Sequence, residues 1–227
     1  MKSKKETLVS YVVPLYNKQA YIAECLTCLQ KQSIDNIEII VVDDCSTDDS
    51  LEIAQFMAKD DKRIKVYHLD ENKGRSYARN YGNKKANGDI IAVNDADDIS
   101  SPHRTKVIQQ AFRKPIDIFY SSFYCQDYTI AAKEFDIEEV KKDLFTYIGH
   151  STMAYRRDVL DKIKYSEGKW SDLGCDDWKF QMDAYSKGMK FGFSEKPLVV
   201  YRTSGNSISK NRDENEIAEL KKKYLGI

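Results

Sequence analysis

Five short apolar runs, rich in β-branched residues, alternate along the first half of the chain with segments whose apolar residues follow helical spacing. The runs occupy residues 8–13, 37–42, 64–69, 89–93 and 116–120. Strands that alternate with helices of about 10–15 residues are typical of βαβ units, whose parallel strands are joined by right-handed crossovers. The chain is therefore predicted to be an α/β protein with a mainly parallel central sheet flanked by helices.

The second half of the chain has a less regular pattern. It predicts helices over 137–146, 157–164, 175–187 and 213–224, and short strands over 190–195 and 198–202. No linker rich in Pro, Gly or Ser separates the halves, so the 227 residues are predicted to form a single domain. We expect about 7–120 to form one half, about 121–205 a second half fused to it, and about 206–227 a C-terminal loop and helix. Ser46 and Ser101 are expected to cap the helices that follow them.

Charge and cysteine content exclude several classes of function. Lys and Arg together number 36, as do Asp and Glu, so the chain lacks the basic field that binds nucleic acid. No apolar run reaches the ~18 residues of a membrane span, and none follows the charged N-terminus, so we expect neither a span nor a signal peptide. Five cysteines, an odd count, favour a reduced, cytoplasmic setting. Cys25 and Cys28 lie inside a predicted helix, which favours buried thiols over a zinc or redox site.

Acidic and amide side chains follow three of the predicted strands. They are Asn17, Asp43, Asp44, Asn94, Asp95, Asp97 and Asp98. Because the carboxyl ends of parallel strands share one edge of a sheet, these groups can converge there. Clustered carboxylates repel one another unless a cation lies among them, and oxygen ligands favour Mg²⁺ or Mn²⁺. The alternative is a set of acidic helix starts that complement helix dipoles.

A metal held by one or two carboxylates usually also binds substrate phosphates. The strand-end acids therefore predict a nucleoside diphosphate or a related anion as ligand. The sequence has no G-x-x-x-x-G-K-[ST] motif and no G-x-G-x-x-G after the first strand. A P-loop nucleotidase and a hydride-transferring dinucleotide enzyme are therefore not expected.

Five motifs, in order along about residues 7–205, resemble those of the family 2 inverting glycosyltransferases, which have the GT-A fold with a Rossmann-like sheet. They are P-x-Y-N within 9–17, V-D-D-x-S-x-D within 41–48, N-x-G…A-R-N within 72–80, D-x-D within 95–98 and E-D-W within 175–178. Asp176 replaces the Glu of the last motif, and Ser204 stands where the family's closing loop often has His. The resemblance is to members that build bacterial polysaccharides or glycoconjugates.

The resemblance implies a site for a nucleoside diphosphate sugar, by default a UDP-sugar, in the first half of the chain. Its donor-binding residues would be Pro14, Tyr16, Asn17, Asp44, Gly74, Arg79, Asp95 and Asp97. Asp44 would accept a hydrogen bond from the base, and Asp95 and Asp97 would lie near the ribose and the metal. Asp97 and Asp98 would bind Mn²⁺ or Mg²⁺. Arg79, with Arg75 as the alternative, would contact the diphosphate, unless both are solvated cations on a helix.

The second half would then bind a glycan or lipid-linked acceptor and supply the general base, Asp177. A carboxylate in this position takes the proton of the acceptor hydroxyl as it attacks the sugar. The alternative is an acidic helix start that supports the dipole. The fallback candidates for the base are Asp172, Asp176 and Asp183. His150 lies in a segment that resembles the border of the family's acceptor cleft, and it either contacts substrate or is structural.

Three further features leave alternatives open. Trp170 is a candidate platform for a sugar ring, or a core residue. Arg202 is a candidate phosphate ligand. Lys221, Lys222 and Lys223 either solvate their helix or attract it weakly to the inner face of the cell membrane.

Two other functions fit part of the pattern. Asp95 and Asp97 resemble the D-x-D of haloacid-dehalogenase phosphohydrolases, although that family places the motif on its first strand and this chain on its fourth. A non-catalytic module that binds a nucleotide sugar or a glycan would keep the pocket without the chemistry.

Overall fold

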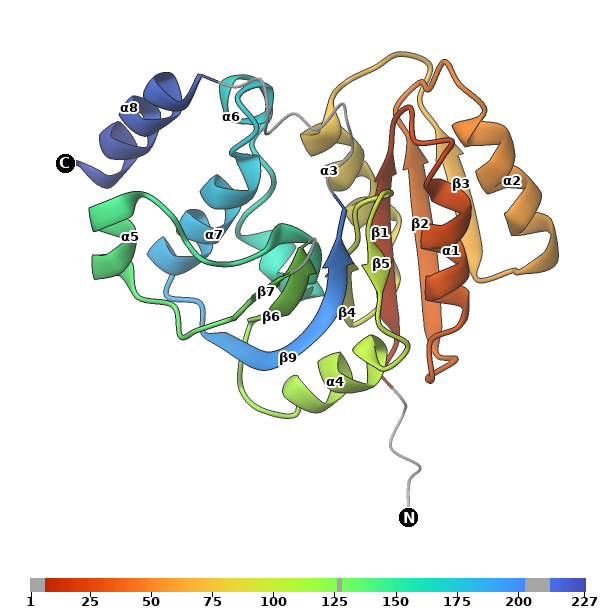
Figure 1. Cartoon of the computed structure of the whole chain (residues 1–227), viewed down its shortest axis with the longest axis horizontal. Coiled ribbons are helices and arrows are strands. Elements are labelled where there is room, and N and C mark those ends of the chain that lie inside the picture. The colour runs from red at the N-terminus through yellow and green to blue at the C-terminus, as the bar shows by residue number, and fades with distance from the viewer. Residues whose placement is uncertain (1–6, 126–127, 203–212) are drawn as a thin grey trace.

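A computed structural model describes residues 7–125, 128–202 and 213–227, which fold around one mixed sheet (Figure 1). The strands are β1 (Val9–Leu15), β2 (Ile37–Asp43), β3 (Ile64–His68), β4 (Ile90–Val93), β5 (Ile99–Ser100), β6 (Ile118–Cys125), β7 (Tyr128–Ile130), β8 (Ala154–Arg156) and β9 (Phe191–Tyr201). The helices are α1 (Ile22–Gln30), α2 (Ser50–Asp60), α3 (Arg75–Lys85), α4 (Arg104–Ala111), α5 (Ile137–Asp143), α6 (Lys169–Asp172), α7 (Asp176–Ser186) and α8 (Glu214–Leu225). Two 3-10 turns, η1 (His150–Thr152) and η2 (Arg157–Asp161), complete the described elements.

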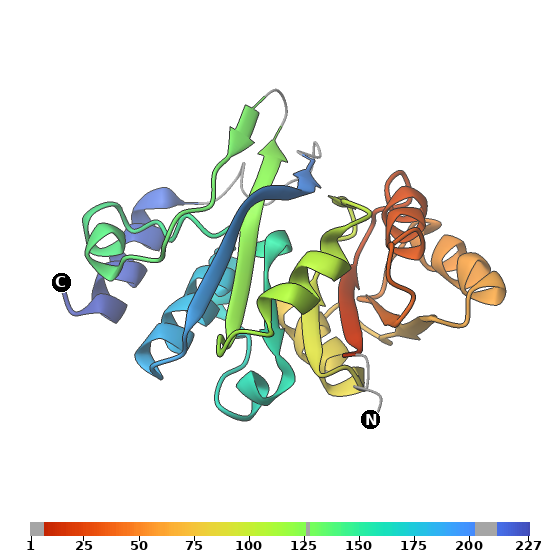
Figure 2. The ribbon, with the colours of Figure 1, turned by 90° about the horizontal axis from the view of Figure 1, so that it is seen from below.

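The strand order across the described sheet is β3-β2-β1-β4-β8-β6-β9-β5, with β7 paired to β6. The first four strands of this order are parallel neighbours, as predicted. Beyond β4 the sheet becomes mixed, because β8 runs antiparallel to both β4 and β6. Strands β6 and β9 then run parallel and side by side (Figure 2). The α/β class and the helix-flanked sheet are therefore confirmed.

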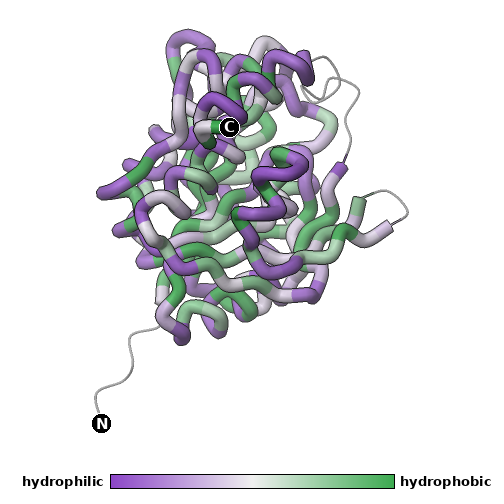
Figure 3. Tube along the Cα trace, turned by 90° about the vertical axis from the view of Figure 1, so that its left-hand side faces the viewer, coloured by the Kyte–Doolittle hydropathy of each residue, from purple (hydrophilic) through white to green (hydrophobic). Residues whose placement is uncertain are grey.

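Alternate residues of β1 face two separate apolar layers. Tyr11 and Val13 pack with residues of α1, α2 and α4, whereas Val12 packs with residues of α3 and α7. The contact with α3 is close, since a Cβ added to Gly82 would lie 2.6 Å from Val12 Cγ1. Only glycine lets this helix approach the strand so closely. Hydrophobic stretches gather in the middle of the molecule and hydrophilic ones on its outer turns (Figure 3).

The second half differs from the prediction at two places. Instead of a helix over 157–164 the chain forms the short turn η2, which ends at Asp161. Four residues further on, Asn80 bonds both the N–H and the carbonyl of Tyr165, which ties this segment to α3. The two strands expected over 190–202 form one strand, β9. Its pairing with β6 shifts register next to Pro197, so the residue that cannot donate a ladder hydrogen bond is accommodated at an irregularity.

Both predicted serine caps are wrong. Ser46 Oγ accepts a hydrogen bond from the backbone N–H of Asn17 at 3.0 Å, and α2 begins only at Ser50. The backbone N–H of Ser101 donates to the carbonyl of Leu198 in β9 at 2.8 Å, which holds residue 101 outside α4. Contacts between segments distant in sequence override the local cap signal at both places.

The cysteine pair of α1 is structural, as predicted. Cys25 is buried and Cys28 half-buried, and both are free thiols. Cys28 Sγ accepts a hydrogen bond from the N–H of Ser100 at 3.1 Å, which ties α1 to β5.

Helix α8 packs on α6 and α7 through aromatic rings. The rings of Trp170 and Trp178 stack with centroids 5.9 Å apart and planes 9° apart, and Tyr224 meets both edge-on. Lys221 Nζ lies over the Trp178 ring and donates to the carbonyl of Leu144 at 2.9 Å. Of the two interpretations of Trp170, a sugar platform or a core residue, the structure supports the core residue. No helix in the described ranges has the length and hydrophobicity of a membrane span.

Glu38 gives the fold a predictable response to acid. It is buried at the amino end of β2, where burial alone would raise its pKa, but hydrogen bonds from Lys65, Ser10 and Asn87 lower the pKa from 4.5 to about 2. A lowered pKa stabilises the folded state above about pH 4.5, and this contribution is lost as the pH falls towards about 2. We expect Glu38→Gln to cost about 1–3 kcal/mol at pH 7 and to weaken the acid dependence of the unfolding free energy.

Denaturant titrations between pH 7 and pH 3 measure this effect, with the exposed Glu52→Gln on α2 as the matched control. Parallel pH profiles for wild type and Glu38→Gln would contradict the prediction.

Candidate active site

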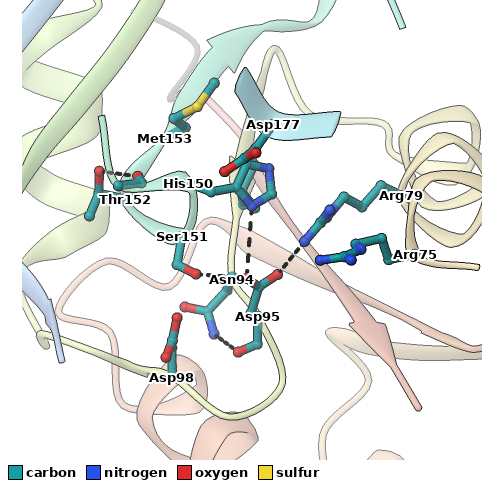
Figure 4. A network of polar contacts seen from close by, with 12 residues as sticks. Arg75, Arg79, Asn94, Asp95, Asp98, His150, Ser151, Thr152, Met153 and Asp177 are labelled. Atoms are coloured by element: carbon teal, nitrogen blue, oxygen red, sulfur yellow. Dashed lines mark hydrogen bonds and ion pairs between the residues drawn. The ribbon is translucent and has the colours of Figure 1, made fainter. Parts of the chain in front are cut away.

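The carboxyl ends of β1, β2 and β4 lie at one edge of the sheet, and the start of α7 joins them there (Figure 4). The acids predicted from the sequence follow these strands. Turn η1, in the loop before β8, adds His150 and Ser151 to the same group. The site is therefore built from segments of both halves of the chain.

The centre of the site is the buried guanidinium of Arg79. Its Nη2 lies 2.9 Å from Asp95 Oδ1 and its Nη1 lies 2.7 Å from Asp176 Oδ2. Burial alone would lower the pKa of Arg79, but Asp95 and Asp176 raise it above its ordinary value. Burial alone would raise the pKa of Asp95, but Arg79 and His150 hold that pKa well below its ordinary value. Arg79 and Asp95 are therefore both charged at neutral pH.

This pairing changes the expectation for Arg79, whose contact with a diphosphate stays a prediction. Both Nη groups already face carboxylates. Arg75, the alternative, lies with Nε 3.6 Å from Asp176 Oδ1, and its side chain is 26% exposed against 6% for Arg79. Arg75 is thus the arginine of this pair with the greater access to a ligand.

His150 has a structural environment. Its Nε2 is 3.0 Å from the hydroxyl of Tyr165, its Nδ1 is 3.8 Å from Asp95 Oδ2, and its side chain is buried. Asp95 Oδ2 also accepts a hydrogen bond from Ser151 Oγ at 3.0 Å. Tyr165 and Ser151 were not among the predicted site residues, and no motif marks Tyr165.

Asp98 has the environment of a cation ligand. It is fully buried; its Oδ1 accepts the N–H of Arg202 at 3.0 Å, and its Oδ2 accepts no hydrogen bond from the described residues. Burial and the charges of Asp95 and Asp97 raise its pKa to about 8. A buried carboxylate beside two others, with one oxygen unused, fits Mg²⁺ or Mn²⁺.

Asp97, the second expected ligand, lies 2.6 Å from Lys18 Nζ, a cation that follows the P-x-Y-N motif and was not predicted. Within the described ranges, no three His, Cys, Asp or Glu side chains are grouped to hold a metal. The protein therefore offers two carboxylates at most from this motif, and a bound phosphate would have to supply further oxygens.

Asp44 holds the loop that precedes α3 by hydrogen bonds to its backbone. Its carboxylate accepts the N–H groups of Lys73 at 2.7 Å and Gly74 at 2.8 Å, and burial raises its pKa in spite of these bonds. Gly74 begins α3 with φ +84°, a conformation that favours glycine. Both residues belong to the site, but Asp44 is buried and already bound to backbone. Its contact with a base stays a prediction.

The turn after β1 carries the other predicted donor residues. Asn17 Oδ1 accepts the N–H of Thr47 at 2.8 Å, which joins this turn to the one after β2. Tyr16 is 44% exposed, so its ring is accessible to a ligand. Pro14 lies opposite Val42 in the β1–β2 ladder, one residue before the strand ends.

Asp177 occupies the first turn of α7, half-buried, and is drawn with the network in Figure 4. Its Oδ1 accepts the N–H of Trp178 at 2.7 Å. The fallback candidates are placed differently. Asp176 is paired with Arg79, Asp183 with Lys179 and Tyr224, and Asp172 is exposed. Asp177 thus remains the preferred candidate for the base.

Arg202 reinforces the D-x-D loop. Its Nε donates to the carbonyl of Asp97, its backbone N–H binds Asp98, and its Nη1 pairs with Glu24. Its contact with phosphate stays a prediction. Ser204, where the family often has His, lies outside the described residues.

A cavity of about 780 Å³ lies elsewhere, between α3 and the region of η2. Asn83, Lys84, Arg157 and Asp161 are among its lining residues, and none of the predicted site residues lines it. The converging strand ends, and not this cavity, therefore define the candidate site.

Comparisons with known proteins identify the family of the chain. Residues 10–164 match the family described as glycosyl transferase family 2. The chain is 29% identical over 222 residues to glycosyltransferase GlyG of Streptococcus pneumoniae, covering 88% of this chain and 72% of GlyG. It is 31% identical to the uncharacterized glycosyltransferase EpsJ of Bacillus subtilis, covering 89% of this chain and 63% of EpsJ. The chain thus spans roughly two thirds of these relatives.

Two solved structures share the fold. Residues 1–349 of S. aureus TarS, in complex with UDP-GlcNAc, superpose with a TM-score of 0.78 at 24% identity, covering 94% of this chain and 64% of that one. The mannosyltransferase PcManGT of Pyrobaculum calidifontis, in complex with GDP-Man and Mn²⁺, gives 0.70 at 18% identity, covering 91% and 60%. The architecture expected from the five motifs is therefore confirmed, and the chain belongs to glycosyl transferase family 2, with the GT-A fold.

Proposed function

We propose that this chain is a metal-dependent, inverting glycosyltransferase. It moves a sugar from a nucleoside diphosphate sugar, by default a UDP-sugar, to a hydroxyl of a glycan or lipid-linked acceptor in the cytoplasm. The observation that carries the proposal is the union of the strand-end acids with the start of α7, through Arg79. That union brings a candidate metal site and a candidate base to one edge of the sheet. Support for the donor class comes from TarS and PcManGT, which were solved with nucleotide sugars.

In this proposal residues 7–120 bind the donor and 121–205 bind the acceptor. The exposed ring of Tyr16 stacks on the base. Asp44 fixes the loop at Gly74, whose backbone lies at the start of α3. Arg75 supplies positive charge towards the diphosphate.

Asp97 and Asp98 would hold Mn²⁺ or Mg²⁺. The metal, when bound, would act as a Lewis acid that stabilises the charge of the leaving diphosphate. Lys18 and Arg202 hold this loop in place without a metal. Lys18 pairs with Asp97, and the backbone N–H of Arg202 donates to Asp98.

Asp177 takes the proton of the acceptor hydroxyl. The hydroxyl oxygen then forms a bond to the anomeric carbon on the face opposite the diphosphate, whose oxygen leaves with the electron pair of the broken bond. A base must be anionic to act, and among the described residues no ion pair engages Asp177, while Asp95 and Asp176 engage Arg79. The base function thus falls to the one acid of the E-D-W segment that is not committed to an arginine.

The donor site can be tested by thermal unfolding in the presence of UDP, GDP, CDP or dTDP, with and without Mn²⁺. A nucleotide at 100 times its Kd stabilises the folded state by about 2.7 kcal/mol. For a chain of this size that raises Tm by about 5–10 °C. We expect one nucleotide to give this rise only with Mn²⁺, and Asp98→Asn to remove the metal-dependent part. A rise that is the same without metal would contradict the metal assignment.

The base can be tested by turnover. Asp177→Asn keeps the size of the side chain but removes the proton acceptor, so we expect the transfer rate to fall by about 100-fold or more while nucleotide binding is retained. The exposed Asp172→Asn, in the preceding helix, is the matched control and should keep the wild-type rate. An Asp177→Asn enzyme with full activity towards a verified acceptor would show that another group is the base.

A further inference from the structure

We propose that Arg79 is a positioning residue: it holds the base, Asp177, against the donor half by pairing the neighbouring Asp176 with Asp95. The inference rests on the proposed function and assigns Arg79 a role other than the diphosphate contact expected from the sequence. It concerns how the start of α7 is held beside the loop after β4.

Three segments distant in sequence meet at this guanidinium. Arg79 comes from the middle of α3, Asp95 from the loop after β4, and Asp176 from the first residue of α7. The Arg79 side chain is 6% exposed and that of Asp176 is 1% exposed. Because Asp177 follows Asp176 directly, a fixed Asp176 fixes the backbone from which the base projects.

Arg79 is itself held from its other sides. Its guanidinium lies 5.5 Å from the centre of the Tyr165 ring. The next residue, Asn80, accepts the N–H of Tyr165 at 3.0 Å and donates to its carbonyl at 2.9 Å. The Tyr165 hydroxyl contacts His150, which flanks Asp95. The guanidinium therefore packs against the Tyr165 ring as well as pairing with the carboxylates of Asp95 and Asp176.

The balance of charge also favours this role over direct binding of a diphosphate. The single charge of Arg79 already faces two carboxylates at short distance, those of Asp95 and Asp176. To contact a phosphate, Arg79 would have to leave the buried carboxylate of Asp176 without this partner, and an uncompensated buried charge is strongly unfavourable. Arg75 is farther from Asp176 and more exposed, so it can supply positive charge to a ligand without that cost.

The test compares Arg79→Gln and Asp176→Asn with Asp176→Glu, which keeps the charge. Glu38→Gln is the matched control, because it removes the charge of a buried, ion-paired carboxylate at the opposite end of the sheet. Four quantities are measured on each variant of the 227-residue chain: kcat, KM for the donor, UDP affinity, and amide hydrogen exchange of the peptide that spans 170–182. Hydrogen exchange needs no activity and reports directly on the start of α7.

We expect Arg79→Gln and Asp176→Asn to lower kcat by about 100-fold with UDP affinity unchanged, because a misplaced base costs that order of rate. Exchange at the start of α7 should become faster in both variants. Asp176→Glu should recover most of the rate, and Glu38→Gln should change neither kcat nor this exchange.

Two results would overturn the inference. One is a loss of UDP affinity in Arg79→Gln with kcat kept, which would make Arg79 a donor ligand. The other is exchange at α7 that matches wild type in both variants. If wild-type protein transfers no sugar, the proposed function fails, and the exchange measurement still decides whether Arg79 holds α7. If Arg79→Gln does not fold, the nearly isosteric Asp176→Asn gives the same decision.

Discussion

One buried guanidinium joins the two halves of this site. Arg79 lies between the carboxylate of Asp95, after β4, and that of Asp176, at the start of α7, and both contacts are shorter than 3 Å. A buried ion pair contributes little net stability, yet removing one partner costs about 3–5 kcal/mol, because the other charge is then left unpaired. The arrangement therefore strongly disfavours any structure in which α7 separates from the strand ends. The remaining features of the site, including the placement of Asp177, depend on that restraint.

The parallel part of the sheet was largely predictable from the sequence. β-Branched runs separated by helices specify parallel strands, and four of them lie where the sequence placed them, with both faces of β1 buried. The second half was less predictable because its elements depend on distant partners. Two strands were predicted over 190–202 where there is one, since the irregular pairing that accommodates Pro197 within β9 is set by β6. The helix expected over 157–164 is a short turn that ends at Asp161, and the chain after it is bound by Asn80 through the backbone of Tyr165.

In the site, too, the sequence predicts where residues lie better than it predicts which groups they contact. Parallel strands fix where their carboxyl ends lie, so the acids near 44 and 95–98 were placed correctly on pattern alone. Which groups those acids meet is decided by tertiary packing, and here prediction was weaker. Asp44 binds the backbone of Lys73 and Gly74, Trp170 stacks on Trp178, and Arg79 meets two carboxylates. No spacing in the sequence distinguishes an arginine that binds a ligand from one that binds a helix.

The proposed reaction is a single displacement at the anomeric carbon, with Asp177 as the base. The configuration of the first product tests this most directly. With an α-linked nucleotide sugar and Mn²⁺, ¹H NMR of the sugar transferred to acceptor or to water, recorded before mutarotation, distinguishes the two anomers. The account predicts the β-anomer as the first product. An α-anomer would contradict it, because retention requires a different chemistry from the one that a lone base at the start of α7 can perform.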